Sequence, residues 1–99
     1  MRFMMLVKAS EALPDIRAYN EQLAKAGVLL DLSGWQPNGA RVKFSGGKAQ
    51  VIDDPGSIAG YWLIQARSKE EAIEWAKRVP FQDGEIEIHR LFELRNDDI

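Results

Sequence analysis

The sequence contains no cysteine and only one histidine among its 99 residues. Without cysteine, this chain has no disulfide, no thiolate metal site and no cysteine nucleophile. A single histidine excludes a histidine-rich metal centre, and the sequence has neither a serine nucleophile elbow nor a phosphate-binding glycine loop. We therefore expect no metal and no cofactor, and we do not expect a serine hydrolase or a nucleotide-binding enzyme.

The sequence also has no excess of basic residues. The 13 Lys and Arg residues are outnumbered by 15 Asp and Glu residues, so the net charge is -2 and the pI is about 5.4. The basic residues are scattered along the chain, whereas phosphate binding requires a basic field. We therefore expect no nucleic-acid partner.

Long hydrophobic runs are missing as well. The apolar stretch near the start of the chain ends at Lys8, which is too short for the hydrophobic region of a signal peptide or for a membrane span. We expect no membrane partner and a cytoplasmic location. The length predicts a single domain over 1–99. A domain this short buries a small fraction of its surface, which favours self-association.

Hydrophobic periodicity predicts core strands, two helices and an inserted hairpin. The core strands are expected at 2–8, 28–33, 59–67 and 85–92, the helices at 11–26 and 68–79, and the hairpin strands at 40–45 and 48–53. Gly46-Gly47 between two alternating runs is a strong hairpin signal.

Both predicted helices carry start and stop signals. Ser10 is expected to cap the first helix, with Pro14 in its first turn and Gly27 at its end. Ser68 and a glutamate three residues later match the capping box of the second helix. Pro80 is expected to end that helix.

The order of these elements, with the hairpin removed, is βαββαβ, which predicts an α+β fold of ferredoxin-like architecture. That topology places its first and third strands in the middle of the sheet. Strands 2–8 and 59–67 are apolar on both sides, as central strands are. Both helices would cover one face of the sheet, and a second copy would cover the other, so we expect a homodimer.

Several stretches resemble the YCII-related family, in particular its DGPF branch. They are residues 25–30, 39–48, 59–65, 68–77 and 84–88, and together they span nearly the whole chain. The resemblance implies a dimeric α/β barrel built from two ferredoxin-like subunits. It also implies a largely unassigned activity: members are suspected of being small enzymes with a pocket near the dimer interface. Some are associated with extracytoplasmic-function sigma factors, which suggests a regulatory role instead.

The sequence departs from the family at its signature. Asp-Gly-Pro-Phe appears here as Asp53-Asp54-Pro55-Gly56, and the segment that normally follows is shortened to Ser57-Ile58. If that segment covers the family's pocket, this chain has a clipped lid.

His89 is the first candidate for proton transfer, because it alone has an unperturbed pKa near neutrality. Period two along the last strand places it on one side with Glu87, away from Ile86 and Ile88. Those two apolar residues should face the helices, so His89 and Glu87 should face the open side. A carboxylate there could orient the imidazole. The alternative is an exposed polar strand face, since residues two apart on a strand need not touch.

Asp31 interrupts an apolar strand, and we expect it to share a face with Leu29 and Ser33. A carboxylate at this position is either held in a cleft or placed at a sheet edge to prevent aggregation. Asp53 matches the first residue of the signature. Paired with Asp54 it could act in acid/base chemistry, but the sequence is also ordinary turn chemistry.

Two further groups are candidates for ligand binding. Arg41, with Lys43 and Lys48, makes the hairpin basic and could hold an anion, although a solvated hairpin face explains these residues equally well. Trp62, with Trp35 and Tyr61, could line an apolar ligand cavity. Packing in the core or at a dimer interface is the alternative for these aromatics.

Two functions from different classes remain. The first is binding of a small organic ligand, possibly an anion, in a cleft of the dimeric barrel, with or without catalysis. In that case His89 would transfer a proton, Asp31 or Asp53 would assist, and Arg41 would hold an anion. The second is a non-catalytic regulatory or protein-interaction module, linked to sigma-factor-dependent transcription through the resemblance. Convergence of His89, Asp31 and Asp53 would favour the first.

Overall fold

A computed structural model describes residues 1–8, 14–36, 39–54 and 58–92 of the chain. These residues form an α+β structure in which the predicted order of strands and helices is confirmed. The elements are β1 (Arg2–Lys8), α1 (Arg17–Lys25), β2 (Leu29–Gly34), β3 (Gly39–Ser45), β4 (Lys48–Asp54), β5 (Ile58–Gln65), α2 (Lys69–Lys77) and β6 (Glu85–Leu91). No helix within the described ranges is long and apolar enough to cross a membrane.

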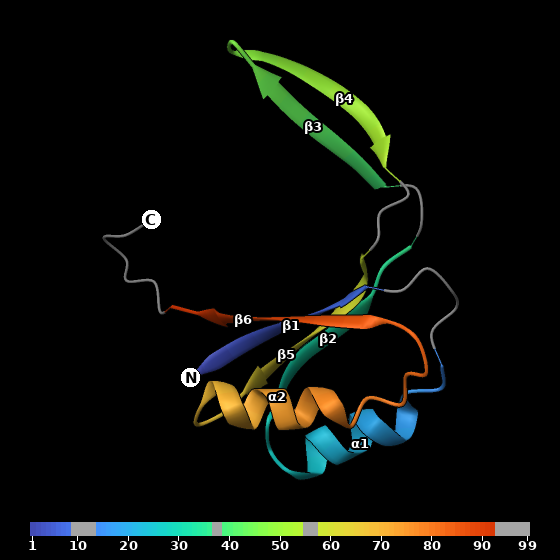
Figure 1. The fold of residues 1–99 in the computed structure, drawn as a ribbon, viewed down its shortest axis with the longest axis vertical. Helices are drawn as coiled ribbons and strands as arrows, with labels where there is room; N and C mark the ends of the chain where they lie inside the picture. Colours follow the sequence, from blue (N-terminus) through green and yellow to red (C-terminus); the bar gives the residue numbers. More distant parts are fainter. Residues whose placement is uncertain (9–13, 37–38, 55–57, 93–99) are drawn as a thin grey trace.

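Four strands form one antiparallel sheet in the order β2-β5-β1-β6, and β3 and β4 form a separate two-stranded sheet. The central pair is β1 and β5, as their apolar sequences predict. Both helices lie on one side of the four-stranded sheet, and the β3–β4 hairpin projects on the other side (Figure 1). The sheet is open, because the described strands close no barrel.

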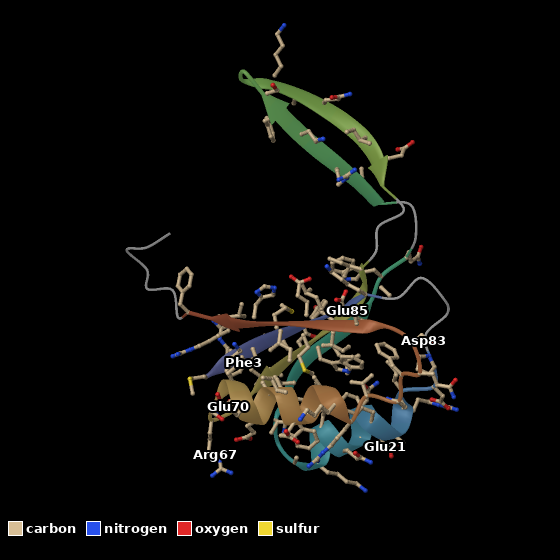
Figure 2. The ribbon with its side chains drawn as sticks, in the orientation of Figure 1. Phe3, Glu21, Arg67, Glu70, Asp83 and Glu85 are labelled. Atoms are coloured by element: carbon tan, nitrogen blue, oxygen red, sulfur yellow. The ribbon has the colours of Figure 1, made fainter. Side chains whose placement is uncertain are left out.

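The core lies between the sheet and the helices, and alternate residues of the central strands build it. Phe3, Met5 and Val7 of β1 and Trp62 and Ile64 of β5 are each at most 2% exposed. Side chains crowd this layer in Figure 2. We call this side of the sheet the helix face. Successive side chains of a strand point in opposite directions, so the intervening residues lie on the other side, which we call the open face.

The first helix begins later than predicted. Residues 14–16 are not helical and α1 starts at Arg17, whereas residues 9–13, with the expected cap Ser10, lie outside the described residues. Asp15 explains the start, because its Oδ1 accepts a hydrogen bond from the Arg17 backbone N–H at 3.1 Å. That bond satisfies one of the N–H groups that a helix start leaves without a partner. At the other end, Gly27 has a φ of 71°, as expected of a residue that ends a helix.

Aromatic residues join α1 to the rest of the core. The Tyr19 hydroxyl donates a hydrogen bond to the backbone carbonyl of Trp75 at 2.8 Å, and burial raises the pKa of Tyr19 to about 12. The Tyr19 ring packs edge-on against Trp62 at 5.1 Å. Trp62 Nε1 donates to Asn20 Oδ1 at 2.7 Å, so the buried indole is hydrogen-bonded as well as packed.

The second helix follows its predicted signals closely. The Ser68 side chain accepts a hydrogen bond from the Glu71 backbone N–H at 3.1 Å, which confirms the predicted cap. The helix ends at Lys77, two residues before the predicted end. Val79 nevertheless belongs to the core, at 8% exposed.

An irregularity in β2 corrects one prediction. The register against β5 shifts between Leu29 and Asp31. Leu29 pairs with Ile64 and packs on the core, whereas Asp31 pairs with Leu63 on the open face. The two residues therefore do not share a face, because the extra residue of a bulge reverses the alternation.

Candidate functional site

The open face of the sheet has an apolar centre between two polar edges. The centre consists of the half-buried side chains Met4, Leu6 and Leu63 on β1 and β5. Strand pairing aligns the face in two rows, Asp31-Leu63-Met4-His89 and Ser33-Tyr61-Leu6-Glu87. No described element covers this face, because both helices pack on the other one (Figure 1). The candidate site is therefore a shallow surface and not an enclosed pocket.

The first polar edge holds His89, Glu87 and Lys8. His89 Nε2 lies 2.7 Å from Glu87 Oε1, and Lys8 Nζ lies 2.8 Å from Glu87 Oε2. The two residues of β6 thus touch, although residues two apart on a strand need not do so. The hydrogen bond from Lys8, followed by that with His89, lowers the pKa of Glu87. The bond to Glu87 in turn raises the pKa of Lys8. The Glu87 carboxylate thus holds both the Lys8 ammonium and the His89 imidazole.

The second polar edge holds Asp31 and Tyr61. The Tyr61 hydroxyl donates a hydrogen bond to Asp31 Oδ2 at 2.8 Å, and this bond raises the pKa of Tyr61. Asp31 Oδ1 accepts a hydrogen bond from the Leu32 backbone N–H at 2.9 Å. Asp31 is exposed on the edge strand β2. It is nonetheless a partnered acceptor with a fixed orientation.

The two edges share a face but do not meet. His89 and Asp31 stand in the same row on the two outer strands, so three strand intervals separate them. At 4.7–4.9 Å per interval, that is about 14 Å between their backbones. Within one chain, the predicted histidine and aspartate therefore cannot act on the same atom of a small ligand.

Asp53 and Arg41 lie elsewhere, on the β3–β4 hairpin. Arg41 is exposed on β3 and pairs with Ile52, and Asp53 is exposed on β4 and pairs with Ala40. The hairpin strands are not hydrogen-bonded to the four-stranded sheet. The structure of one chain thus does not bring His89, Asp31 and Asp53 together.

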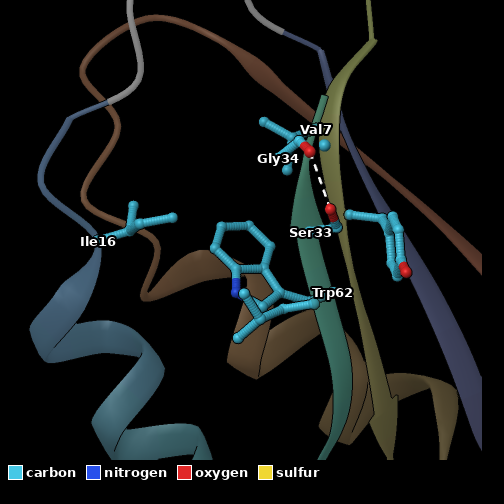
Figure 3. A pocket seen from close by; sticks show the side chains of 8 residues that line it. Val7, Ile16, Ser33, Gly34 and Trp62 are labelled. Carbon is cyan, nitrogen blue, oxygen red and sulfur yellow. Dashed lines mark hydrogen bonds between the residues drawn. The ribbon is translucent and has the colours of Figure 1, made fainter. Parts of the chain in front are cut away.

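Trp62 lies on the helix face, opposite the other candidates. At 2% exposed it is a core residue, which agrees with the packing alternative. It does line a small hollow beside the start of α1, together with Ile16 and Val7 (Figure 3). The hollow offers about 30 Å³, which is room for water but not for an organic ligand. A ligand on the open face would not touch Trp62.

Sequence reasoning missed two members of the site. In the sequence, Lys8 stands out only as the end of an apolar run, although period two from Leu6 places it on the open face. Tyr61 stands out only as one of several aromatic residues, and its hydrogen bond to Asp31 depends on the register of β2 against β5. Alternation along one strand could have found Lys8, whereas no single-strand pattern could have found the Tyr61 partner.

Among the described residues, no three His, Asp or Glu side chains gather as metal ligands would.

Comparison with known protein families shows that the YCII-related domain matches residues 1–95 of the chain. The chain belongs to the YCII-related family. No curated protein matches it. The family assignment agrees with the resemblance seen in the sequence, and it leaves the activity of this YCII-related chain to be argued from the site.

Proposed function

We propose that this YCII-related chain works as a homodimer that binds a small organic anion on the open face of its sheet. Here His89 exchanges a proton with the ligand. The observation that carries the proposal is the contact of 2.7 Å between His89 and Glu87 on an uncovered apolar face. An apolar surface with a few oriented polar groups is the usual composition of a ligand site. On this proposal the subunit is ferredoxin-like, of the DGPF branch, and two subunits form an α/β barrel.

The polar groups fit this chemistry. Glu87 holds Nε2 of the imidazole, which leaves Nδ1 to exchange a proton with a bound ligand. Lys8 lowers the pKa of Glu87 and adds a positive charge beside the histidine. Across the face, Asp31 and Tyr61 offer an acceptor and a hydroxyl to the far end of a ligand. Met4, Leu6 and Leu63 give an apolar body a surface to lie on.

Dimerisation supplies what one chain lacks. A shallow face binds small ligands poorly, and a second sheet packed over it would enclose the ligand and exclude water. A two-fold axis would also bring the Asp31 edge of one copy over the face of the other. The 14 Å or so between His89 and Asp31 within one chain then no longer prevents joint action. Arg41 could reach a ligand only if the hairpin bends over a site, its own or the partner's.

The test is a titration followed by ¹H–¹⁵N NMR, with benzoate, phenylacetate and the neutral benzyl alcohol as probes. We expect the carboxylates to shift amide signals of β1, β5 and β6, and benzyl alcohol to do so more weakly. His89→Gln should weaken carboxylate binding about tenfold, since one lost polar contact is worth about 1.4 kcal/mol. Glu87→Gln removes a negative charge beside the site and releases Lys8, so it should strengthen carboxylate binding.

Glu74→Gln is the matched control for the glutamate variant. Glu74 is an exposed carboxylate that pairs with Lys77 at 3.0 Å on α2, on the other side of the sheet. Its variant should bind the probes as the wild type does. Shifts confined to the helices, or equal binding by all variants, would contradict the proposed site. The regulatory alternative would then be preferred.

A further inference from the structure

The β3–β4 hairpin has an apolar face that the chain itself does not cover. Pairing places Val42 opposite Val51, and Phe44 opposite Ala49, on the same side of the ribbon. Val42, Phe44 and Val51 are 52%, 74% and 70% exposed. We call these four residues the arm face. The opposite side of the same strands carries the pairs Arg41–Ile52 and Lys43–Gln50.

An uncovered hairpin of this kind needs a packing partner. A two-stranded hairpin by itself is at best marginally stable in water. Burial of apolar surface stabilises a protein by about 25 cal/mol for every Å² removed from water. The exposed side chains of the arm face lack this stabilisation within one copy. Within the described part of the chain, β3 and β4 are hydrogen-bonded in a sheet only with each other. Something outside this copy is therefore expected to cover the arm face.

The position of the hairpin narrows the choice of partner. It projects on the side of the sheet away from both helices, which is the side of the open face (Figure 1). Two uncovered apolar surfaces of one chain thus belong to the same side of the molecule. A second copy that packs on the open face comes within reach of the hairpin, and by symmetry its own hairpin comes within reach of the first copy.

Charge favours a second copy over other partners. The hairpin, residues 39–54, contains three basic residues, Arg41, Lys43 and Lys48, and two acidic ones, Asp53 and Asp54, a net charge of +1. The rest of the chain holds ten of the 13 basic residues and 13 of the 15 acidic ones, a net charge of -3. A hairpin of charge +1 and a body of charge -3 attract each other. Nucleic acid or an anionic membrane would attract the hairpin but repel the body.

We propose that the β3–β4 hairpin is an arm that packs its apolar face on a second copy of this chain. This inference rests on the proposed dimer and identifies the hairpin as the segment that stabilises that dimer. Arg41 and Lys43 lie on the opposite side of the arm, so their side chains point away from the partner surface that the arm face covers.

The first experiment compares two neighbouring substitutions in the full chain by sedimentation equilibrium. Val51→Asp places a carboxylate in the arm face, and Gln50→Asp places the same carboxylate one residue away on the opposite side. We expect Val51→Asp to raise the dimer dissociation constant more than about tenfold and Gln50→Asp to change it less than about twofold. The NMR signals of β1 and β5 should be unchanged in both variants, which shows that the body still folds.

The second experiment shows on which copy the arm lies. The chain has no cysteine, so a nitroxide on Gln50→Cys is a unique label. Chains that carry the nitroxide but no ¹⁵N are mixed with ¹⁵N chains that carry no nitroxide. Any loss of amide signal then arises from a nitroxide on another copy. We expect signal loss in the ¹⁵N chains.

The outcomes separate the arm from the dimer. If Val51→Asp dimerises like the wild type and no signal is lost, the arm is overturned while the dimer stands. A wild type that is monomeric at every concentration overturns both. A monomer whose hairpin signals shift with phosphatidylglycerol vesicles would assign the arm to a lipid surface and overturn the proposal as well.

Discussion

The two faces of the sheet come from the same strands but differ in what they hold. On β5, Trp62 and Ile64 are almost completely buried on the helix face, whereas Tyr61 and Leu63 between them are half-buried on the open face. The same contrast runs along β1. Because the backbone is shared, the difference comes only from what packs above each face.

The distribution of ionisable groups follows from this contrast. No charged residue is buried among the described residues, and the carboxylates of Asp31 and Glu87 lie on the open face. Burying an unpaired charge costs several kcal/mol, so the helix face admits polar atoms only where they are hydrogen-bonded, as in Tyr19 and Trp62. One face of the sheet thus holds the core, and the other carries ionisable side chains.

The largest expected effect comes from truncating neighbours that point to opposite faces. Ile64→Ala removes a completely buried side chain from the helix face and should lower the free energy of unfolding by about 2–5 kcal/mol. Leu63→Ala removes a half-buried side chain from the open face. Its cost should be smaller in the separated chains and should grow with protein concentration, because the proposed partner covers Leu63. Urea unfolding at two protein concentrations measures both.

The Ile64→Ala variant serves as the control for that concentration dependence. Its loss of stability relative to the wild type should be the same at both concentrations, since Ile64 has no access to a partner. Equal and concentration-independent costs for the two variants would show that the faces do not differ as proposed.

The fold was largely predictable because its signals are local. Alternation along β1 and β5, the Gly46-Gly47 turn, Gly27 and the Ser68 cap each depend on a few adjacent residues, and each is confirmed. The errors have local causes as well. Asp15 takes the role of starting α1, and the bulge in β2 separates Leu29 from Asp31. A bulge depends on the partner strand, so the strand's own pattern does not reveal it.

The site was less predictable because it depends on register. That Glu87 and His89 share a face follows from period two, but their contact with each other and with Lys8 depends on side-chain conformation and on the pairing of β1 with β6. Asp53 was linked to His89 only through the family signature, and the hairpin carries it to a separate sheet. Residues on different strands are brought together by pairing that no single segment encodes.

A smaller effect is expected where two strands approach closely. A Cβ added at Gly60 would lie 2.5 Å from the Ser33 backbone oxygen, so β2 would have to move. We expect Gly60→Ala to lower the free energy of unfolding by about 1–3 kcal/mol, as overpacking does. Its pairing partner provides the control, because a Cβ at Gly34 would meet only the Ala59 backbone oxygen at 3.9 Å. Thermal unfolding of the two alanine variants should therefore separate them, and similar melting temperatures would contradict this steric account.

The smallest effect concerns the titration of the open face. The pKa of Glu87 is lowered from its usual value of 4.5, chiefly by the hydrogen bond from Lys8 and then by that with His89. The folded protein therefore binds the proton less readily than the unfolded chain. The stabilisation is complete above about pH 4.5 and is lost as the pH falls through the lowered pKa.

Glu87→Gln should consequently reduce the loss of stability between about pH 5 and pH 3, and Lys8→Met should reduce it as well, because Lys8 is the main cause of the shift. The double variant should lose no more of the pH dependence than Glu87→Gln alone, since both changes remove the same interaction. Urea unfolding across this pH range, with the four proteins side by side, is the measurement. If Lys8→Met keeps the full acid sensitivity of the wild type, the ion pair is not what sets the pKa of Glu87. The pKa of Glu87 would then be lowered mainly by its other hydrogen-bond partner among the described residues, His89.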